Sequence, residues 1–170
     1  MRAGGTSLGA VCGLFVFLAM LPPRATETLA DLQARFDRES SGVHKAKLLG
    51  KLGDAQFEEA RRAGKDGDFN TVGLTLEKYR DNVRATVEAL KKQHPDAEKQ
   101  SNGYRQLEMQ LRKGIREVEE TLLASPEPYK PPLQLVRQDL IGLDDELLKM
   151  LFPRRPLDQR SAPPPPEKQP

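Results

Sequence analysis

The sequence contains one cysteine and no tryptophan, and its aromatic residues are six phenylalanines and three tyrosines. The cysteine, Cys12, lies in an apolar run near the N-terminus, so the rest of the chain cannot form an internal disulfide. A fold without disulfides depends on its hydrophobic core. With so few aromatic residues, we expect that core to consist mainly of leucine and valine.

An excess of one charge sign is also missing. Two of the 27 basic residues lie within the first 25 positions, which hold no acidic residue, so the remainder carries 25 residues of each sign. Nucleic-acid binding needs a concentrated basic stripe. The basic residues here occur in short pairs such as Arg61-Arg62 and Lys91-Lys92. We therefore predict no nucleic-acid partner.

Residues 1–25 have the layout of a secretory signal peptide. Arg2 supplies a positive charge, Leu8–Leu21 is almost wholly apolar, and Pro22-Pro23 breaks any helix before Ala25. This apolar run is shorter than the roughly 20 residues that a membrane-spanning helix needs. We expect an exported protein, periplasmic or secreted, with no other membrane contact. Cleavage after Ala30 and an uncleaved N-terminal membrane anchor are the alternatives.

No stretch alternates polar and apolar residues with period two, so we predict no strands. Apolar residues instead recur at spacings of three and four, which indicates amphipathic helices. The first expected helix begins at a Thr28–Asp31 capping box, and the second spans 43–63. The third is capped by Asp68 and ends at His94-Pro95. The fourth and fifth span 101–122 and 133–150. The fold class is therefore all-α, an antiparallel bundle of four to five helices with short connections, over domain 26–152.

Two expected helices have seams near heptad spacing, as in coiled coils. In the third helix Thr86 occupies one position of an otherwise apolar seam. In the fifth the seam is Leu133, Val136, Leu140, Leu143, Leu147 and Met150. We expect Leu140 to be a core residue.

Two segments are rich in proline. Residues 125–132 hold four prolines, which favours a stiff connector between the fourth and fifth helices. Residues 153–170 hold seven prolines and almost no apolar residue, so we predict a disordered tail. A spacer role or plain terminal disorder is favoured for the tail over docking of its Pro163–Pro166 run into an aromatic groove.

Residues 49–83 resemble a single tetratricopeptide-type helical hairpin. The similarity rests on Leu52-Gly53, Phe57, Gly67-Asp68-Phe69, Val72, Leu76 and Tyr79. It implies two antiparallel helices that form a protein-binding surface. The whole chain also resembles exported bacterial helical-bundle proteins that have no assigned activity.

The sequence offers no catalytic, cofactor or metal site. His44 lies among lysines and His94 lies beside a proline, and neither follows a carboxylate at the spacing of di-iron bundles. We interpret them as an exposed residue in a first helical turn and a polar helix end. Met109 and Met150 are interpreted as packing residues. No nucleophile motif or phosphate loop is present, and we predict that the chain is not an enzyme.

The carboxylates lie beside basic residues at helical spacing. Glu58-Glu59 precedes Arg61-Arg62, and Glu117, Glu119 and Glu120 follow Arg112-Lys113, which favours ion pairs within each helix. The cluster Asp144-Asp145-Glu146 is bracketed by Leu143 and Leu147, so we place it on the outer face of the fifth helix.

Glycine recurs inside the expected helices, at Gly50, Gly53, Gly73, Gly114 and Gly142 among other positions. A glycine in a helix interior costs about 1 kcal/mol relative to alanine. Close approach of two helices compensates for that cost, and we expect it at Gly53 and Gly73.

These observations predict a non-catalytic interaction or scaffold module that binds another protein along the 49–83 hairpin. A small-ligand or metal-responsive sensor of the envelope and a chaperone-like envelope-stress protein are the alternatives. The sensor would need a polar cluster inside the bundle, and the chaperone-like protein would need an exposed apolar concave face.

Overall fold

The computed structural model describes residues 27–153. The expected signal peptide and nearly all of the proline-rich tail lie outside these residues. The described chain forms five α-helices and one short 3-10 helix, and it contains no strand. The helices are α1 (Leu29–Arg38), α2 (Gly42–Lys65), α3 (Phe69–Gln93), α4 (Ser101–Ala124) and α5 (Lys130–Leu151), with η1 (Glu127–Tyr129) before α5. The predicted all-α class is confirmed.

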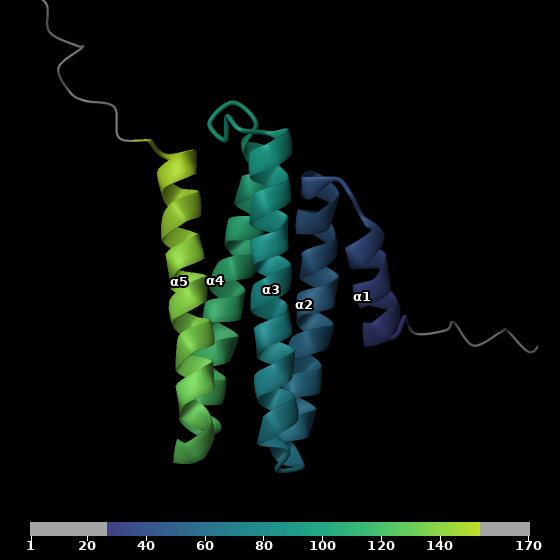
Figure 1. Cartoon of the computed structure of the whole chain (residues 1–170), viewed down its shortest axis with the longest axis vertical. Helices are drawn as coiled ribbons and strands as arrows, with labels where there is room; N and C mark the ends of the chain where they lie inside the picture. The colour runs from purple at the N-terminus through teal and green to yellow at the C-terminus, as the bar shows by residue number, and fades with distance from the viewer. Residues whose placement is uncertain (1–26, 154–170) are drawn as a thin grey trace, which may run out of the picture.

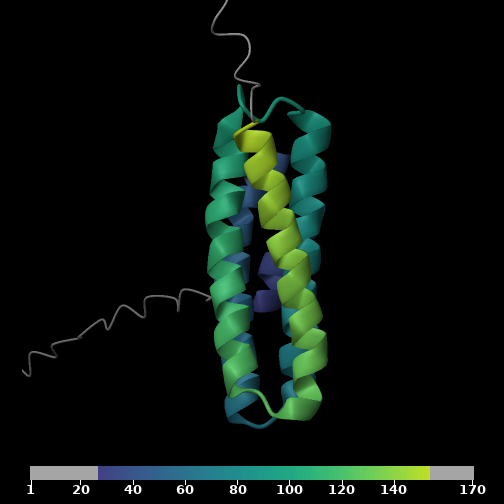
Figure 2. The same ribbon diagram turned by 90° about the vertical axis from the view of Figure 1, so that its left-hand side faces the viewer.

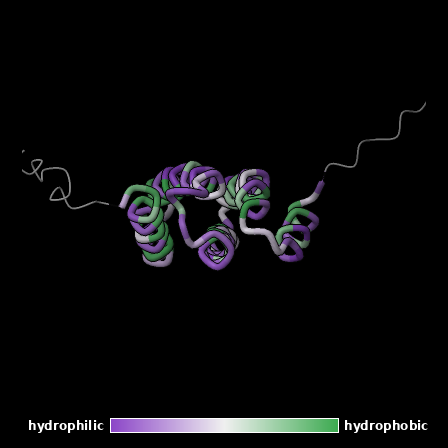
Figure 3. Tube along the Cα trace, turned by 90° about the horizontal axis from the view of Figure 1, so that it is seen from above, coloured by the Kyte–Doolittle hydropathy of each residue, from purple (hydrophilic) through white to green (hydrophobic). Residues whose placement is uncertain are grey.

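Four long helices form an antiparallel bundle and α1 packs on its side. The α2–α3 and α4–α5 hairpins lie beside each other, with α2 against α4 and α3 against α5 (Figure 2). The shorter α1 packs along α2, at the opposite side of the molecule from α5 (Figure 1). The view from above shows the same order, with α1 and α5 at the two ends and the other three helices between them (Figure 3).

Local sequence signals determine several helix ends. Thr28 and Asp31 form the predicted capping box, in which the Thr28 Oγ1 accepts from the Asp31 amide and Asp31 accepts from the Thr28 amide. The side chain of Asp68 accepts from the amide of Thr71 and caps α3. Gly67 before it has a φ of 78°, which glycine adopts without a steric penalty. At the far end α3 stops at Gln93, before His94-Pro95, as expected.

The connector between α4 and α5 is shorter than the sequence predicts. Pro131 and Pro132 lie in the first turn of α5, which begins at Lys130. The first turn has no intrahelical acceptors for its N–H groups, so a proline there loses no hydrogen bond. Only 125–129 joins the two helices, and η1 forms most of it.

The core is built mainly from leucine and valine, as expected, with a few alanine and aromatic side chains. Leu140 is fully buried, and so is Thr86, whose hydroxyl donates to the carbonyl of Asn82. Leu143 and Met150 are only partly buried and pack at the edge of the core. The core position predicted for Leu140 is therefore confirmed.

Many of the expected intrahelical ion pairs are instead formed between helices. Arg62 pairs with Glu59 and Arg112 with Glu108 inside one helix. Two further pairs join α2 to α4, Arg61 with Glu117 and Lys113 with Asp54, each at 2.5 Å. A third joins α5 to α4, Arg137 with Glu119 at 2.6 Å. Packing places these side chains opposite a second helix, which spacing along one helix does not reveal.

Candidate functional site

Glycines allow close contact at one place in the expected hairpin. A Cβ at Gly53 would lie 3.0 Å from the ring of Tyr79, so the close approach predicted there is confirmed. The prediction for Gly73 is wrong, because a Cβ there would meet no atom within 4 Å. Gly114 of α4, for which sequence reasoning made no prediction, lies against the other side of the Tyr79 ring. The available signal was its spacing, three residues after Leu111 and four before Val118, within the apolar stripe of α4.

The α1–α2–α3 groove is a solvent-open space of about 670 Å³ on the side of the α2–α3 hairpin. Its lining comes from the first residues of α1, the middle of α2 and the first half of α3: Thr28, Leu29, Ala30, Gln33, Gln56, Glu59, Arg62, Leu74, Thr75 and Lys78. It therefore lies on the 49–83 hairpin that the sequence singled out, at the end of α1 where the chain enters that helix.

One exposed leucine lies in this groove. Leu74 is 67% exposed, although neighbouring Val72 and Leu76 are buried. Lys78 lies one turn further along α3 and forms no ion pair in the part of the chain that the structure describes. A large apolar side chain next to an unpaired cation is available to a second molecule.

A buried glutamine also lines the groove. Gln56 is 2% exposed, and its Oε1 has no hydrogen-bond partner among the described residues. Leaving a buried acceptor unpaired costs about 1 to 3 kcal/mol. The sequence spacing indicates that Gln56 is buried, because it lies one heptad after buried Leu49 and one heptad before buried Ala63.

A second buried amide, Asn82 of α3, is fully paired by α1. Asn82 is also 2% exposed. Its Nδ2 donates to Gln33 Oε1 at 2.9 Å, and Gln33 Nε2 donates back to Asn82 Oδ1 at 3.1 Å. Leu32 and Phe36 of α1 are buried on either side of Gln33 along the helix. α1 thus covers one part of the hairpin with apolar side chains and an amide pair.

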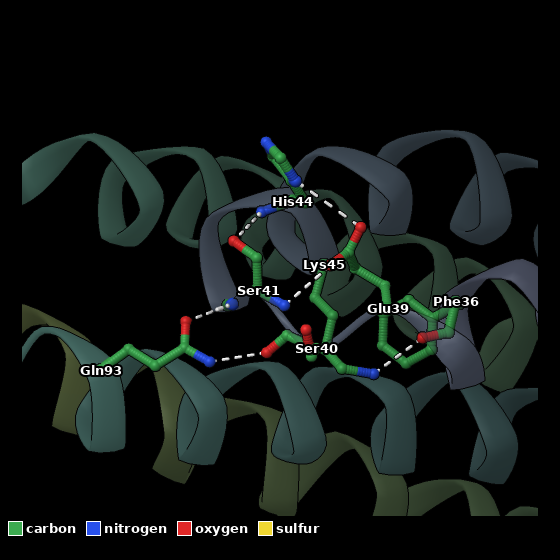
Figure 4. A network of polar contacts seen from close by, with 8 residues as sticks. Phe36, Glu39, Ser40, Ser41, His44, Lys45 and Gln93 are labelled. Atoms are coloured by element: carbon green, nitrogen blue, oxygen red, sulfur yellow. Dashed lines mark hydrogen bonds and ion pairs between the residues drawn. The ribbon is translucent and has the colours of Figure 1, made fainter.

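The carboxyl end of α1 is held by a polar network at the corner between α1 and α2 (Figure 4). Lys45 Nζ donates to the Phe36 carbonyl at 2.7 Å and lies 4.1 Å from the centre of its ring. Partial burial lowers the pKa of Lys45. Gln93 at the end of α3 accepts from the Gly42 amide and donates to the Ser40 carbonyl. The network fixes this corner, whereas the amino end of α1 borders the open groove.

The two histidines lie apart from this groove. His44 is exposed in the first turn of α2, with Nδ1 3.6 Å from Glu39 Oε2. His94 caps α3, and its carbonyl accepts from the Tyr104 hydroxyl at 2.7 Å. These places match the interpretations from sequence. Met150 packs against the core, whereas Met109 is 55% exposed, so its expected packing role is wrong. Within residues 27–153, no group of three or more His, Cys, Asp or Glu side chains is placed to hold a metal ion.

The acidic cluster of α5 does not lie wholly on the outer face as predicted. Asp144 is partly buried, and its Oδ1 has no hydrogen-bond partner in the described part of the chain. Burial raises the pKa of this carboxyl, against the opposing effect of Arg112. Glu146 also faces a neighbour, because it pairs with Lys91 of α3. Of the three, Asp145 alone is exposed, since α5 turns its neighbours toward α3 and α4.

A smaller crevice of about 350 Å³ lies between α2, α3 and α4 near the α2–α3 turn. Small residues, Ala60 and Gly64 among them, leave this space between the helices. Its hydroxyl groups are already paired, since Ser125 donates to the Thr121 carbonyl and Thr121 to the Glu117 carbonyl. The α1–α2–α3 groove is the stronger candidate because its buried amide lacks a partner.

Comparison with known proteins finds no matching family model, curated protein or solved structure. None of the helices between residues 27 and 153 combines the length and the apolar character required to cross a membrane.

Proposed function

We propose that this chain is an exported, non-catalytic interaction module that binds another protein through the α1–α2–α3 groove. The observation that carries the proposal is the exposed Leu74 beside Gln56, a buried side chain whose Oε1 has no partner. Single exposed apolar residues are common on protein surfaces. An exposed leucine next to an unpaired buried amide is the arrangement that a binding partner would complete.

Two further observations support a protein partner over a small molecule. The groove is open and bordered by three helices, whereas small-ligand sites bury most of their ligand. The hairpin that forms it is also the segment that resembles a tetratricopeptide-type unit. The absence of nucleophile motifs from the sequence supports the non-catalytic part of the proposal.

Affinity capture with matched variants tests the binding function. The tagged protein is incubated with extract of its own envelope or medium, alongside Leu74→Arg and Leu135→Arg. Leu135 is the control because it is 61% exposed and belongs to α5, the helix at the opposite side of the molecule from α1 in Figure 1. We expect a partner that wild type and Leu135→Arg retain and Leu74→Arg loses. A partner retained equally by all three proteins would contradict binding at the groove.

The export part of the proposal has a separate test. N-terminal sequencing of the mature protein should find a chain shorter by about 25 residues and located outside the cytosol, as expected of a signal peptide. Recovery of intact Met1 from the soluble cytosol would contradict export and leave the binding proposal unaffected.

A further inference from the structure

α1 shows which kind of element the side of the α2–α3 hairpin accommodates. Leu32 and Phe36 of this helix are buried, and Gln33 exchanges two hydrogen bonds with buried Asn82. The hairpin therefore binds an amphipathic helix whose amide satisfies a buried amide of the bundle.

α1 leaves the rest of the hairpin uncovered. α1 begins at Leu29, and in Figure 1 the α2–α3 hairpin continues well beyond that end. Leu74 and Lys78 precede Asn82 by two turns and one turn of α3, and both line the open groove. Gln56 is as deeply buried as Asn82 but has no equivalent of Gln33. One helix thus satisfies the first buried amide, and nothing in the described chain satisfies the second.

We propose that the groove binds a short amphipathic helix of a partner protein, placed in line with α1. This deepens the proposed function and rests on it. The helix places apolar side chains on Leu74 and Leu29 and supplies a hydrogen-bond donor to Gln56. Because the Gln56 Oε1 is shielded from solvent in the free chain, the Gln56 side chain rotates to meet this donor. The segment 56–65 of α2 extends about 15 Å, which accommodates a helix of about ten residues.

Charge determines the direction of this helix. The amino end of α1 carries the positive end of its dipole, which the Asp31 carboxylate compensates in part. A helix in line with α1 is therefore favoured with its negative, carboxyl end toward Thr28. Lys78 on the groove wall adds an unpaired positive charge. The occupant is therefore a helix with acidic side chains flanking its apolar stripe.

Selection from a peptide library tests this inference. A phage-displayed library of helical peptides keeps leucine at positions i, i+3 and i+7, the spacing of Leu29, Leu32 and Phe36, and randomises the other positions. It is selected on the full chain. We expect binders with Gln, Asn, Lys or Arg at i+4, the position equivalent to Gln33, and with net negative charge. Their affinity should fall at least tenfold on Leu74→Glu, which removes the apolar contact and repels an acidic helix, and stay unchanged on Leu135→Glu.

Gln56→Leu tests whether Gln56 contacts the bound helix. If Gln56 had a purely structural role, this variant would leave the sequence preference of the selected peptides unchanged. Selection on this variant should lose the preference for a donor at i+4 and favour an apolar residue there. An unchanged preference would overturn the role assigned to Gln56. Binders that Leu74→Glu does not weaken would overturn the groove as their site.

Other occupants give distinct results, each of which overturns the partner helix. Self-association that Leu74→Arg abolishes would assign the groove to a second copy. A disulfide between Cys12 and a cysteine introduced by Leu74→Cys would assign it to this chain's own N-terminal segment. If the library yields no binder but affinity capture finds a Leu74-dependent partner, the helical occupant is wrong and the binding function stands. If both fail, both proposals fall.

Discussion

The ring of Tyr79 occupies the space that a side chain at position 114 would need. A Cβ on Gly114 would lie 2.5 Å from the Tyr79 hydroxyl oxygen. That hydroxyl donates a 2.7 Å hydrogen bond to the carbonyl of Gln110, one turn earlier in α4. Burial raises the pKa of Tyr79, so the hydroxyl keeps its proton. The contact joins α3 to α4 through the centre of the bundle.

Gly114→Ala should destabilise the fold by about 1 to 3 kcal/mol, the usual cost of overpacking a core. The ring cannot move aside freely, because Gly53 and Phe57 contact its other side and its hydroxyl is hydrogen-bonded. Urea unfolding followed by circular dichroism measures the change. A stability equal to or above that of wild type would show that the ring is not confined.

Gly73→Ala and Gly142→Ala should each stabilise the protein by about 0.5 to 1 kcal/mol, the gain in helix propensity. A Cβ at either position meets no atom within 4 Å. The same urea titration measures both variants and provides the matched comparison for Gly114→Ala. Destabilisation by either would mean that these glycines have a role that packing does not show.

Gln56→Leu and Asn82→Leu should change stability in opposite directions. Gln56→Leu removes an unpaired buried acceptor, so the free energy of unfolding should rise by about 1 kcal/mol. Asn82→Leu removes two hydrogen bonds to Gln33, so the free energy of unfolding should fall by about 1 kcal/mol or more. Thermal unfolding of both variants is the measurement. A loss of stability in Gln56→Leu would show that its amide is paired in solution.

Asp144→Asn should stabilise the protein at neutral pH. Burial raises the pKa of Asp144, so the folded state binds a proton on this carboxyl more tightly than the unfolded state does. The free energy of unfolding therefore falls as the pH rises from 3.8 through the raised pKa. The advantage of the variant should disappear as the pH falls toward and below 3.8, the ordinary value for the carboxyl. Urea unfolding at several pH values tests this, with Glu120→Gln as an exposed control. A pH-independent difference would point to a cause other than ionisation.

The local features of the fold could be predicted from the sequence. The capping box at Thr28, the cap at Asp68 and the stop at His94-Pro95 each depend on residues within one turn, and all three are present. The apolar stripe identified Leu140 as buried because a helix places residues three and four apart on one face. Hydrogen-bonding caps and helical periodicity act over a few residues, so a single chain reveals them.

Only the tertiary structure decided which helix faces which. Gly73 and Gly114 are both interior helical glycines, yet the ring of Tyr79 lies against only Gly114. Arg61 has Glu58 three residues earlier on its own helix and still pairs with Glu117 of α4. The groove likewise depends on where α1 begins relative to Leu74 and Gln56. These contacts join residues far apart in the chain, and the packing of whole helices determines them.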